Sequence, residues 1–598
     1  MPDAAALAGR REHAISEVER VLCTEGGFLR RLPNADAEAM PRRGFVAGWE
    51  LSFRPVERIR RLNLYVDSSF PFSVPRLLLV DPPPFLTWPH IEEDGVLCLD
   101  PRLTVDPSQP VGVVQYLLKS AHDLLVDSEL RKNQDDFRAE FQSYWYWKRS
   151  EGTVPVYSLL EPHGPSRKAS LWRGQGVWVA GENEGAVLRW LRNWTGNQKE
   201  PGAAEASCIL WLERPPLPAE YSERPTDVWK LARSAAGGTE VLSEVVSEDR
   251  DSFAFILGAT SANGPCFGAV KLSSAVVRNV MGRDVNSTGK GFRRGHVPRP
   301  LLAQRMFNAP GQVSRSEVQR ADPSWIHGRD RDPRYETLRT CRVAVVGCGA
   351  IGAPVAIQLA MAGVGAVLMI DPEVLKWSNV GRHPLGAGSV DKSKSSELAK
   401  KLTSDFPHAV FESRWQSLGE TLFKEPQILQ ERDLIVCATG IWGVESAMNA
   451  WQMSENVPRH IVYSWMEPHA CAGHAVGITK GGPCLQCHFS AVGDSDTKVT
   501  DWPEAAPTSE PACGAIYQPY GPVELSWITA LAAGLALDCL LGKIPKSTHR
   551  IWAGPRALLD AAGGYWNRDW VAARREREMG GFQEELPWAG NATCPICS

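Results

Sequence analysis

The sequence lacks the features that define several classes of protein. Lys and Arg total 65 against 69 Asp and Glu, so the formal charge is only −4 and no excess of one sign is available to hold nucleic acid or an anionic membrane. The longest apolar candidate, residues 530–541, is short for a membrane span and contains Asp538. The N-terminal residues contain no apolar signal segment. We expect no nucleic-acid partner, no membrane span and no secretion signal.

Cysteine is too sparse for a disulfide scaffold, with 14 in 598 residues. Repeats of fixed period and low-complexity tracts are absent as well, and 43% hydrophobic with 22% charged residues is ordinary for a globular chain. Four cysteines form two Cys-x-x-Cys pairs, which suits a reducing compartment. Because the chain is too long for one core, we expect a multidomain cytoplasmic protein.

The pattern of apolar residues changes twice along the chain. In residues 1–150, helical patterns enclose alternating strand-like runs, which predicts a compact α+β domain. Residues 151–325 contain short strand-like runs between Pro, Gly and Ser clusters and predict a mixed α/β middle domain with a linking or positioning role. Residues 326–598 alternate strands and helices, which predicts an α/β domain with a doubly wound, mostly parallel sheet.

A glycine-rich motif opens the third region. Gly347-x-Gly349-x-x-Gly352 follows a strand and begins a helix, where backbone amides can approach a phosphate. Asp371 ends the next strand, where a carboxylate can accept hydrogen bonds from ribose hydroxyls. By base rate such a motif predicts NAD.

Three polar residues after the ribose strand favour ATP instead. Asn379, Arg382 and Lys394 form a polar and cationic series, and fixed positive charge suits a triphosphate that loses pyrophosphate rather than a hydride transfer. A solvated surface is the alternative for Arg382 and for Lys394.

The two Cys-x-x-Cys pairs lie more than one hundred residues apart and predict a closed, structural Zn²⁺ site. A redox pair is the alternative, and His488 is the one other nearby ligand. The four predicted ligands are Cys484, Cys487, Cys594 and Cys597.

The run GCGAIGAPVAIQLAMAGVGAVLMIDPEVLKWSNVGRHPLG, followed by KSKSSELAKKL, resembles the adenylating domain of ubiquitin-activating enzymes and of the ThiF and MoeB group. The resemblance covers roughly residues 335–598. It implies that ATP activates a C-terminal carboxylate as an acyl-adenylate, with Asp371 on the ribose, Asn379 and Arg382 near the phosphates and Lys394 on the leaving pyrophosphate. Lys392 is the second candidate for that last role. The family is commonly dimeric, which implies a homodimer.

One position departs from this family. An acidic residue that helps to hold Mg²⁺ is expected after the fourth strand, where this chain has Gly440. Glu445 is only a weak substitute, so the Mg²⁺ ligands stay open.

Cys513 lies between Pro511 and Gly514 in a Pro-rich stretch, which gives a thiol the access that a nucleophile needs. The resembling family carries its thioester cysteine in a comparable crossover loop, so Cys513 is the candidate for the first thioester. Four cysteines on apolar elements are predicted to be buried and inert, namely Cys348, Cys437, Cys471 and Cys539.

Residues 71–100 resemble the catalytic segment of ubiquitin-conjugating enzymes, in PFSVP, RLLLVDPPPF and HIEEDGVLCLD. The resemblance makes Cys98 the second thioester cysteine; by composition alone it would be a core residue. The family's His-Pro-Asn tripeptide is replaced by Trp88-Pro89-His90, and His90 is a hypothetical donor to the oxyanion.

Fusion of an activating and a conjugating module resembles bacterial proteins of antiviral CBASS operons. The resemblance implies that a protein C-terminus, that of a cGAS-like nucleotidyltransferase, passes from AMP to Cys513, then to Cys98, and finally to a lysine or other amine. Two alternatives stay open. One is activation of a sulfur carrier, which would leave Cys98 idle, and the other is a nucleotide-binding scaffold without catalysis, motivated by Gly440.

Overall fold

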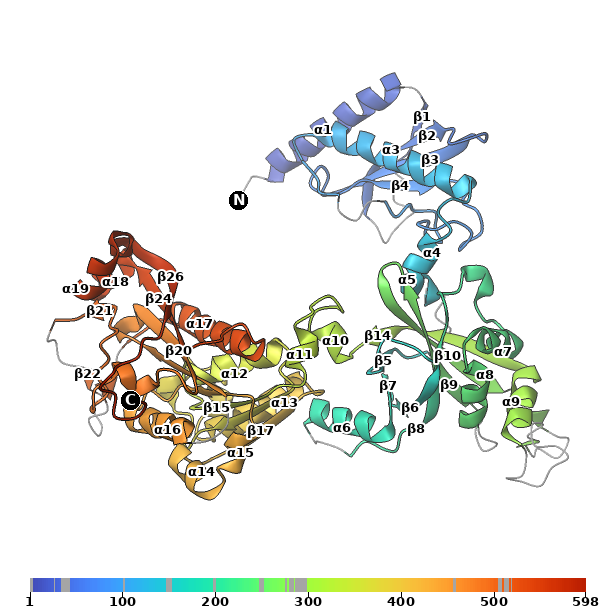
Figure 1. The fold of residues 1–598 in the computed structure, drawn as a ribbon. Coiled ribbons are helices and arrows are strands. Elements are labelled where there is room, and N and C mark those ends of the chain that lie inside the picture. The colour runs from blue at the N-terminus through green and yellow to red at the C-terminus, as the bar shows by residue number, and fades with distance from the viewer. Residues whose placement is uncertain are drawn as a thin grey trace. The chain divides into compact units, whose positions relative to one another are not determined.

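The computed structural model describes most of the chain: residues 4–25, 27–33, 44–99, 103–146, 153–196, 200–246, 252–274, 277–278, 284–285, 298–454, 459–503, 508–509, 516–517 and 519–598. They form two compact units (Figure 1). The first unit consists of Met1–Glu182 and Glu205–Gln319, and the second of Asn183–Ala204 and Arg320–Ser598.

The N-terminal part of the first unit is an antiparallel sheet covered by two helices. Its strands pair in sequence order: β1 (Phe28–Arg31), β2 (Phe45–Phe53), β3 (Arg60–Asp67) and β4 (Arg76–Leu79). The helices α1 (Ala4–Glu25) and α3 (Pro110–Glu129) contact each other in front of the sheet (Figure 1). Trp49 and Leu64 from the strands pack with Leu117 and Leu125 of α3, so the predicted α+β pattern is present.

The rest of the first unit is built on an eight-stranded sheet of order β13-β10-β9-β8-β6-β7-β5-β14. The strands are β5 (Val156–Ser158), β6 (Arg167–Arg173), β7 (Trp178–Gly181), β8 (Glu205–Trp211), β9 (Ser252–Ser261), β10 (Gly264–Ser274), β13 (Gly311–Ser316) and β14 (Val318–Arg320). The helices are α4 (Asp136–Ala139), α5 (Phe141–Trp145), η1 (Pro218–Glu220), α7 (Pro225–Ser234), α8 (Gly238–Val245) and α9 (Arg299–Asn308). Phe137 and Trp145 share one core with Leu210 and Phe255, so α4 and α5 pack with this sheet.

One helix of the middle region belongs to the second unit. α6 (Glu184–Thr195) lies between β7 and β8 in the sequence but packs on α13 (Lys394–Asp405). Asn183 caps its first turn by accepting a hydrogen bond from the amide of Ala186 at 2.9 Å. The Asn193 side chain donates to the carbonyl of Pro407 at 2.9 Å. α6 is therefore bound to the helix that begins with Lys394.

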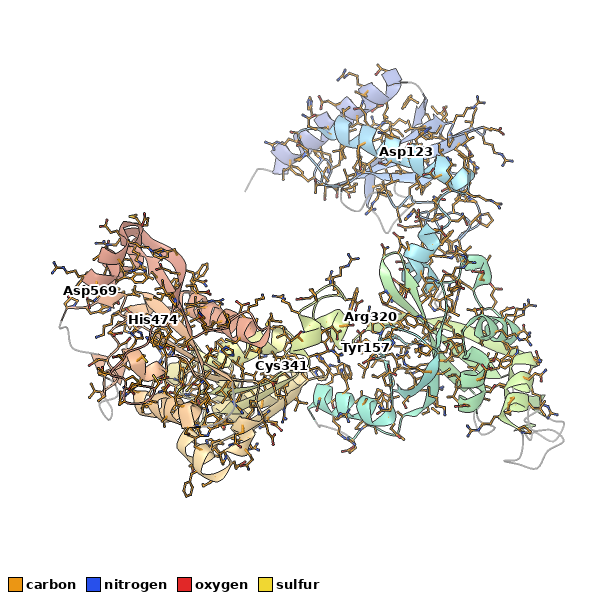
Figure 2. All side chains as sticks on the ribbon, viewed as in Figure 1. Asp123, Tyr157, Arg320, Cys341, His474 and Asp569 are labelled. Carbon is orange, nitrogen blue, oxygen red and sulfur yellow. The ribbon has the colours of Figure 1, made fainter. Side chains whose placement is uncertain are left out.

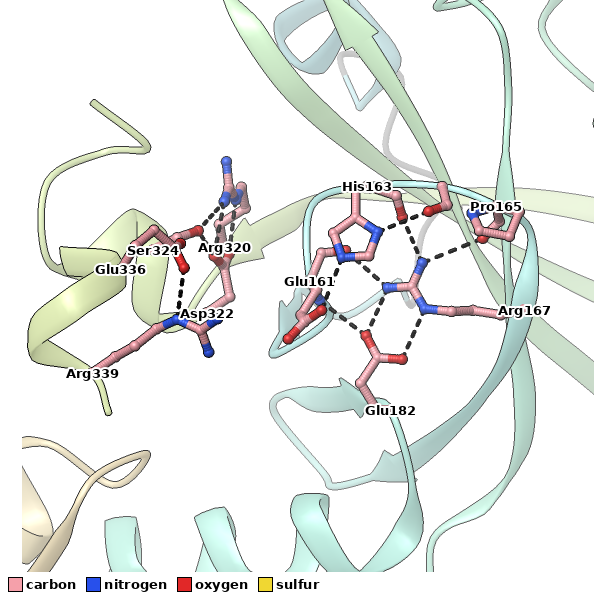
Figure 3. Close-up of polar contacts among 11 residues, drawn as sticks. Glu161, His163, Pro165, Arg167, Glu182, Arg320, Asp322, Ser324, Glu336 and Arg339 are labelled. Atoms are coloured by element: carbon pink, nitrogen blue, oxygen red, sulfur yellow. Dashed lines mark hydrogen bonds and ion pairs between the residues drawn. The ribbon is translucent and has the colours of Figure 1, made fainter. Parts of the chain in front are cut away.

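Arginine networks hold the chain where it leaves one unit and enters the other (Figure 3). In the first unit, Arg167 donates to both carboxylate oxygens of Glu182, at 2.6 and 2.8 Å. In the second unit, the buried Arg320 side chain pairs with Asp322 at 2.8 Å and also with Asp330. Two-pronged pairs of this kind fix orientation as well as position.

The second unit contains the predicted doubly wound sheet, of order β17-β16-β15-β18-β19-β20-β24-β26. The first five strands are parallel: β17 (Val410–Arg414), β16 (Ala366–Ile370), β15 (Arg342–Val346), β18 (Leu434–Cys437) and β19 (His460–Met466). β20 (Ala472–Thr479), β24 (Thr548–Pro555) and β26 (Gly580–Pro587) extend it antiparallel.

Helices cover both faces of this sheet (Figure 1). α12 (Gly352–Met361), α13 and α17 (Pro522–Leu540) pack in one core cluster, whereas α14 (Leu418–Lys424) and α16 (Trp442–Ser454) contribute to another. The remaining helices are α10 (Pro323–Ile326), α11 (Tyr335–Leu338), α15 (Gln427–Gln430), α18 (Arg556–Ala562) and α19 (Arg568–Ala573). Side chains fill the layers (Figure 2), and His474 of β20 is fully buried. Because both faces are covered, the central strands have the continuous apolar runs seen in the sequence.

α17 is long and apolar enough to cross a membrane by composition, with a hydropathy of 1.5. Its residues Ile528, Leu535 and Ala536 are nevertheless fully buried against the sheet. We therefore assign α17 to the protein core.

Candidate functional site

The glycine loop lies where the carboxyl ends of β15 and β18 meet, the usual ligand position in a doubly wound sheet. Gly347 has a φ of 85°, and a Cβ there would lie 2.7 Å from the carbonyl oxygen of Ala438. A Cβ on Gly352 would lie 1.8 Å from the carbonyl oxygen of Gly347. A Cβ on Gly349 would meet no atom within 4 Å. Two glycines thus allow the turn, and the third leaves the loop open to a ligand.

Asp371 is tied to this loop. Its buried carboxylate accepts hydrogen bonds from the amide of Cys348 at 2.6 Å and from the amide of Glu373 at 2.7 Å. Burial raises the pKa of Asp371, and the two amides act in the opposite direction. The predicted ribose acceptor is therefore held against the predicted phosphate loop.

Lys394 begins α13 beside Asp371 and is only 5% exposed, which excludes the solvated-surface alternative for this residue. Its amine pairs with the carboxylate of Glu373, and its positive charge counteracts the rise in the pKa of Asp371. Lys392 instead donates to the carbonyl of Gly388 at 2.9 Å. Of the two lysines considered, Lys394 is the one that the fold buries at the loop.

Asn379 and Arg382 have other partners. The Asn379 side chain accepts from the amide of Lys376 at 3.0 Å, and the Arg382 guanidinium lies 5.0 Å from the centre of the Tyr520 ring. The neighbour His383, which the sequence did not single out, is buried, and its Nε2 lies 2.8 Å from the carbonyl oxygen of Cys348. His383 therefore ties the polar segment to the glycine loop.

A cavity of about 430 Å³ adjoins the loop at Gly349. Its aromatic wall includes the stacked rings of Trp442 and Phe489, with centroids 4.7 Å apart, and Trp465. No local pattern predicted this wall, because its members come from α16, β19 and a later loop. It can receive an apolar or planar group next to the phosphate loop.

Glu445 is the carboxylate that lines this cavity. It accepts hydrogen bonds from the Thr439 hydroxyl at 3.1 Å and from the amide of Gly440 at 3.0 Å. Burial raises its pKa to about 7. Mg²⁺ in nucleotide sites commonly uses one or two carboxylates together with substrate phosphates, so Glu445 offers a single suitable oxygen donor here.

The four predicted zinc ligands do come together. Their sulfur atoms all lie within 4.8 Å of one another, with Cys484 and Cys594 3.6 Å apart and Cys487 and Cys597 3.4 Å apart. Tetrahedral zinc with bonds of about 2.3 Å places its sulfurs about 3.8 Å apart, so this group can hold a structural metal such as zinc. His488 is bound instead to Asp496 and the carbonyl of Ala589.

The remaining predicted cysteines divide into two sets. Cys513 lies outside the described residues. The four cysteines predicted to be inert are buried, and burial raises the pKa of each: Cys348, Cys437, Cys471 and Cys539.

Cys98 lies in the first unit and is exposed, which the predicted thioester role requires. Bridges between Leu78 and Val96 and between Ile91 and Leu97 fold its segment back beside β4. The Cys98 sulfur lies 3.6 Å from a carboxylate oxygen of Glu92. Partial burial and the charges of Glu92 and Glu140 raise the pKa of Cys98 to about 11.

His90 lies beside Cys98 through the backbone, because the amide of Cys98 donates to the His90 carbonyl at 2.8 Å. The amide of His90 donates to the Tyr144 hydroxyl at 2.8 Å, and the imidazole lies 3.2 Å from Asp136 and 3.6 Å from Glu140. The imidazole thus contacts carboxylates. An oxyanion role for His90 stays a prediction.

Two family models match the chain. Residues 327–554 match the ThiF family, and residues 39–154 match prokaryotic E2 family B. The chain is therefore a fusion of an E2-like domain with an E1-like, ThiF-type adenylating domain, as the sequence predicted, and an enzyme of the adenylyltransferase and ligase type. ThiF-type adenylation implies ATP and Mg²⁺.

Several known proteins are similar to this chain over part or most of its length. The ATP-dependent ubiquitin transferase-like protein Cap2 of Pseudomonas aeruginosa is 24% identical over 504 residues, which span 80% of this chain and 85% of that protein. The adenylyltransferase and sulfurtransferase MOCS3 of Mus musculus is 35% identical over 300 residues, 47% of this chain and 55% of that protein. A crystal structure of E. coli MccB overlaps 44% of this chain and 69% of its own, at 14% identity and a TM-score of 0.31.

Proposed function

We propose that this protein activates the C-terminal carboxylate of another protein and passes the acyl group through Cys513 and Cys98 to an amine. ATP-dependent activation and conjugation follow from the two domains, and the individual thioester steps are our proposal. The observation that carries it is the exposed Cys98 on an E2-like domain, in a chain that also holds Asp371 and Lys394 at a glycine loop.

Each step balances. A carboxylate oxygen attacks the α-phosphorus of ATP, and the bond to pyrophosphate breaks; Lys394, Arg382 and Asn379 are assigned to the phosphates. The Cys513 thiolate then attacks the acyl carbon and AMP leaves. The Cys98 thiolate displaces Cys513, and a lysine nitrogen finally displaces Cys98 and gives up a proton to solvent.

The activated protein is, in our proposal, a cGAS-like nucleotidyltransferase, and the setting is antiphage defence of the CBASS type in the cytoplasm. The likeness to Cap2 over 85% of that protein supports this setting. We further propose a homodimer formed through the adenylating domain, and three functional regions: 1–150 for conjugation, 151–325 for positioning and 326–598 for activation.

The test uses the full chain with ATP, labelled pyrophosphate and a cGAS-like nucleotidyltransferase. Pyrophosphate exchange should require the intact C-terminus of that protein, persist in Cys513→Ala and be lost in Asp371→Asn. An adduct that reducing agent removes should form on Cys513 in Cys98→Ala, without any amide product. Exchange that does not depend on the C-terminus would contradict the proposal.

The likeness to MOCS3 favours a second candidate, activation of a sulfur carrier. That function needs the adenylating domain and leaves Cys98 idle. Normal product formation by Cys98→Ala would therefore favour the sulfur-carrier function over conjugation.

A further inference from the structure

The first unit contains a cavity of about 510 Å³ that none of the proposed steps uses. It lies inside that unit, between the segment after β4, helix α4, the η1 turn and strand β13. Ligand pockets for small molecules have volumes of about 300–1,000 Å³. The wall is mixed. Its apolar and aromatic members include Phe85, Trp88, Phe137, Leu217 and Tyr221, and its polar members are Thr87, Arg131, Gln134, Glu223 and Arg315.

Among the polar residues of this wall, Arg315 of β13 is the one whose guanidinium lies against aromatic rings. Its guanidinium lies over the Tyr221 ring at 4.9 Å and the Trp145 ring at 5.4 Å. Its Nη1 atom is buried and has no hydrogen-bond partner among the residues that the structure describes. Burial lowers the pKa of Arg315, and Glu223 supplies the nearby negative charge without bonding to it.

Arg315 is half-buried, and a buried guanidinium nitrogen without an acceptor is costly because it loses water without gaining a hydrogen bond. The Tyr221 hydroxyl is a second buried group without a partner in the described part of the chain. A ligand with an acidic group would satisfy the arginine, and its flat apolar part would lie against the aromatic wall.

We propose that this cavity is a binding site for a small molecule that combines an acidic group with a flat apolar body, and that Arg315 is the residue that selects the acid.

The cavity is connected to the thiol site within the same unit. The Phe137 ring lies 4.8 Å from the Tyr144 ring, and the Tyr144 hydroxyl accepts the hydrogen bond from the His90 amide. Trp88, in the wall, is two residues from His90, whose carbonyl accepts from the amide of Cys98. Occupancy of the cavity should therefore change the accessibility of Cys98 to alkylation.

The test measures the fluorescence of two dyes added to the full chain: 1-anilinonaphthalene-8-sulfonate and its neutral counterpart N-phenyl-1-naphthylamine. We expect saturable binding of the sulfonate. Arg315→Met should weaken the affinity for the sulfonate by about tenfold or more and change the affinity for the neutral dye by less than about threefold. Arg315→Lys keeps the charge and loses the planar fork, so its affinity for the sulfonate should lie between those of the wild type and of Arg315→Met.

Two further variants control this experiment. Arg214→Met removes an exposed arginine that lines a neighbouring cavity and not this one, and it should leave sulfonate binding unchanged. Thr87→Trp should prevent binding of both dyes, because the indole would fill the cavity from its exposed edge while Arg315 stays in place. If Arg315→Met lowers the melting temperature, Thr87→Trp still tests whether the dyes bind in this cavity.

Competition and alkylation complete the test. Displacement of the sulfonate by phenylacetate or by phenyl phosphate identifies the acid as a carboxylate or a phosphate, and displacement by neither overturns the proposal. An equal loss of affinity for both dyes in Arg315→Met overturns the proposal as well, since the site would then bind only apolar groups. The rate at which iodoacetamide labels the Cys98 peptide should change when the sulfonate is added to the wild type, and it should not change when the sulfonate is added to Thr87→Trp.

Discussion

Partial burial and the neighbouring carboxylates together set the chemistry of the Cys98 sulfur. Burial contributes most to a pKa of about 11, followed by the negative charge of Glu92 and then that of Glu140. Such a thiol is almost entirely protonated at neutral pH, so it resists stray alkylation and needs a reactive acyl donor.

We therefore predict that Glu92→Gln lowers the pKa of Cys98 and raises its rate of alkylation at pH 8. A shift of about half a unit to one unit gives an increase of about threefold to tenfold in thiolate. Iodoacetamide labelling, read at the Cys98 peptide by mass spectrometry, measures the rate. Glu93→Gln changes the exposed neighbour and should have little effect; an equal increase there would show that Glu92 has no special role.

Glu445 gives a prediction about stability. Its pKa in the folded protein, about 7, exceeds the ordinary value of 4.5, so folding favours the protonated form. The resulting stability is fully present below the unfolded pKa and is lost as pH rises through 7. Relative to Glu445→Gln, which does not titrate, the wild type should lose on the order of 3 kcal/mol of unfolding free energy between pH 4.5 and 8.

Urea denaturation of both proteins across this pH range measures the difference. Glu578→Gln changes an exposed carboxylate of the same unit, and its unfolding free energy should depend on pH in the same way as that of the wild type. A constant difference between Glu445→Gln and the wild type would mean that folding leaves the pKa of Glu445 unchanged.

At the scale of elements, the cysteine cluster joins two segments that are distant in the sequence. Cys484 precedes the η6 turn (Leu485–His488) and Cys487 lies within it, and the other pair lies at the end of the described chain. The Trp588 indole also donates to the Cys484 carbonyl at 2.9 Å, so the end of the chain is fixed beside β20 and β26.

We predict about one zinc ion per chain, and its loss in Cys594→Ser, with a melting temperature lower by at least about 5 °C. Elemental analysis and thermal unfolding measure both quantities. Cys23→Ser, on the exposed face of α1, should keep the metal and the melting temperature. A metal-free wild type that forms disulfides within each Cys-x-x-Cys pair would instead establish the redox alternative.

Elements with a strong local pattern could be predicted from the sequence. The runs at β15, β16, β18 and β19 predicted parallel strands because buried strands need apolar residues on both faces. The glycine spacing likewise predicted the loop that Asp371 holds. These features depend on residues close in sequence.

Features that depend on distant contacts could not be predicted. The placement of α6 on α13 and the wall formed by Trp442, Trp465 and Phe489 join segments far apart in the chain. The buried, unpartnered Nη1 atom of Arg315 becomes visible only when Trp145 and Tyr221 enclose it. Neither the spacing nor the composition of residues predicts contacts between segments that are distant in the chain.

For the whole molecule, the covalent connection between the two thiols is the property that the fusion adds. In the proposed relay, a thioester on Cys513 would meet Cys98 of the same chain at an effective concentration of about mM, far above the concentration of enzyme in an assay. Covalent connection should therefore make transfer independent of dilution, whether the acyl group moves within a chain or across a stable dimer.

We predict that the rate of conjugation per wild-type chain stays constant when the enzyme is diluted about tenfold at saturating ATP and substrate proteins. An equimolar mixture of Cys513→Ala and Cys98→Ala chains supplies the contrast, because any product from it requires transfer between chains. Such product should fall with dilution for freely exchanging monomers and persist at constant yield for a stable dimer. A wild-type rate per chain that falls about tenfold on dilution would mean that the thiols meet only by collision, and fusion would then have no role in the relay.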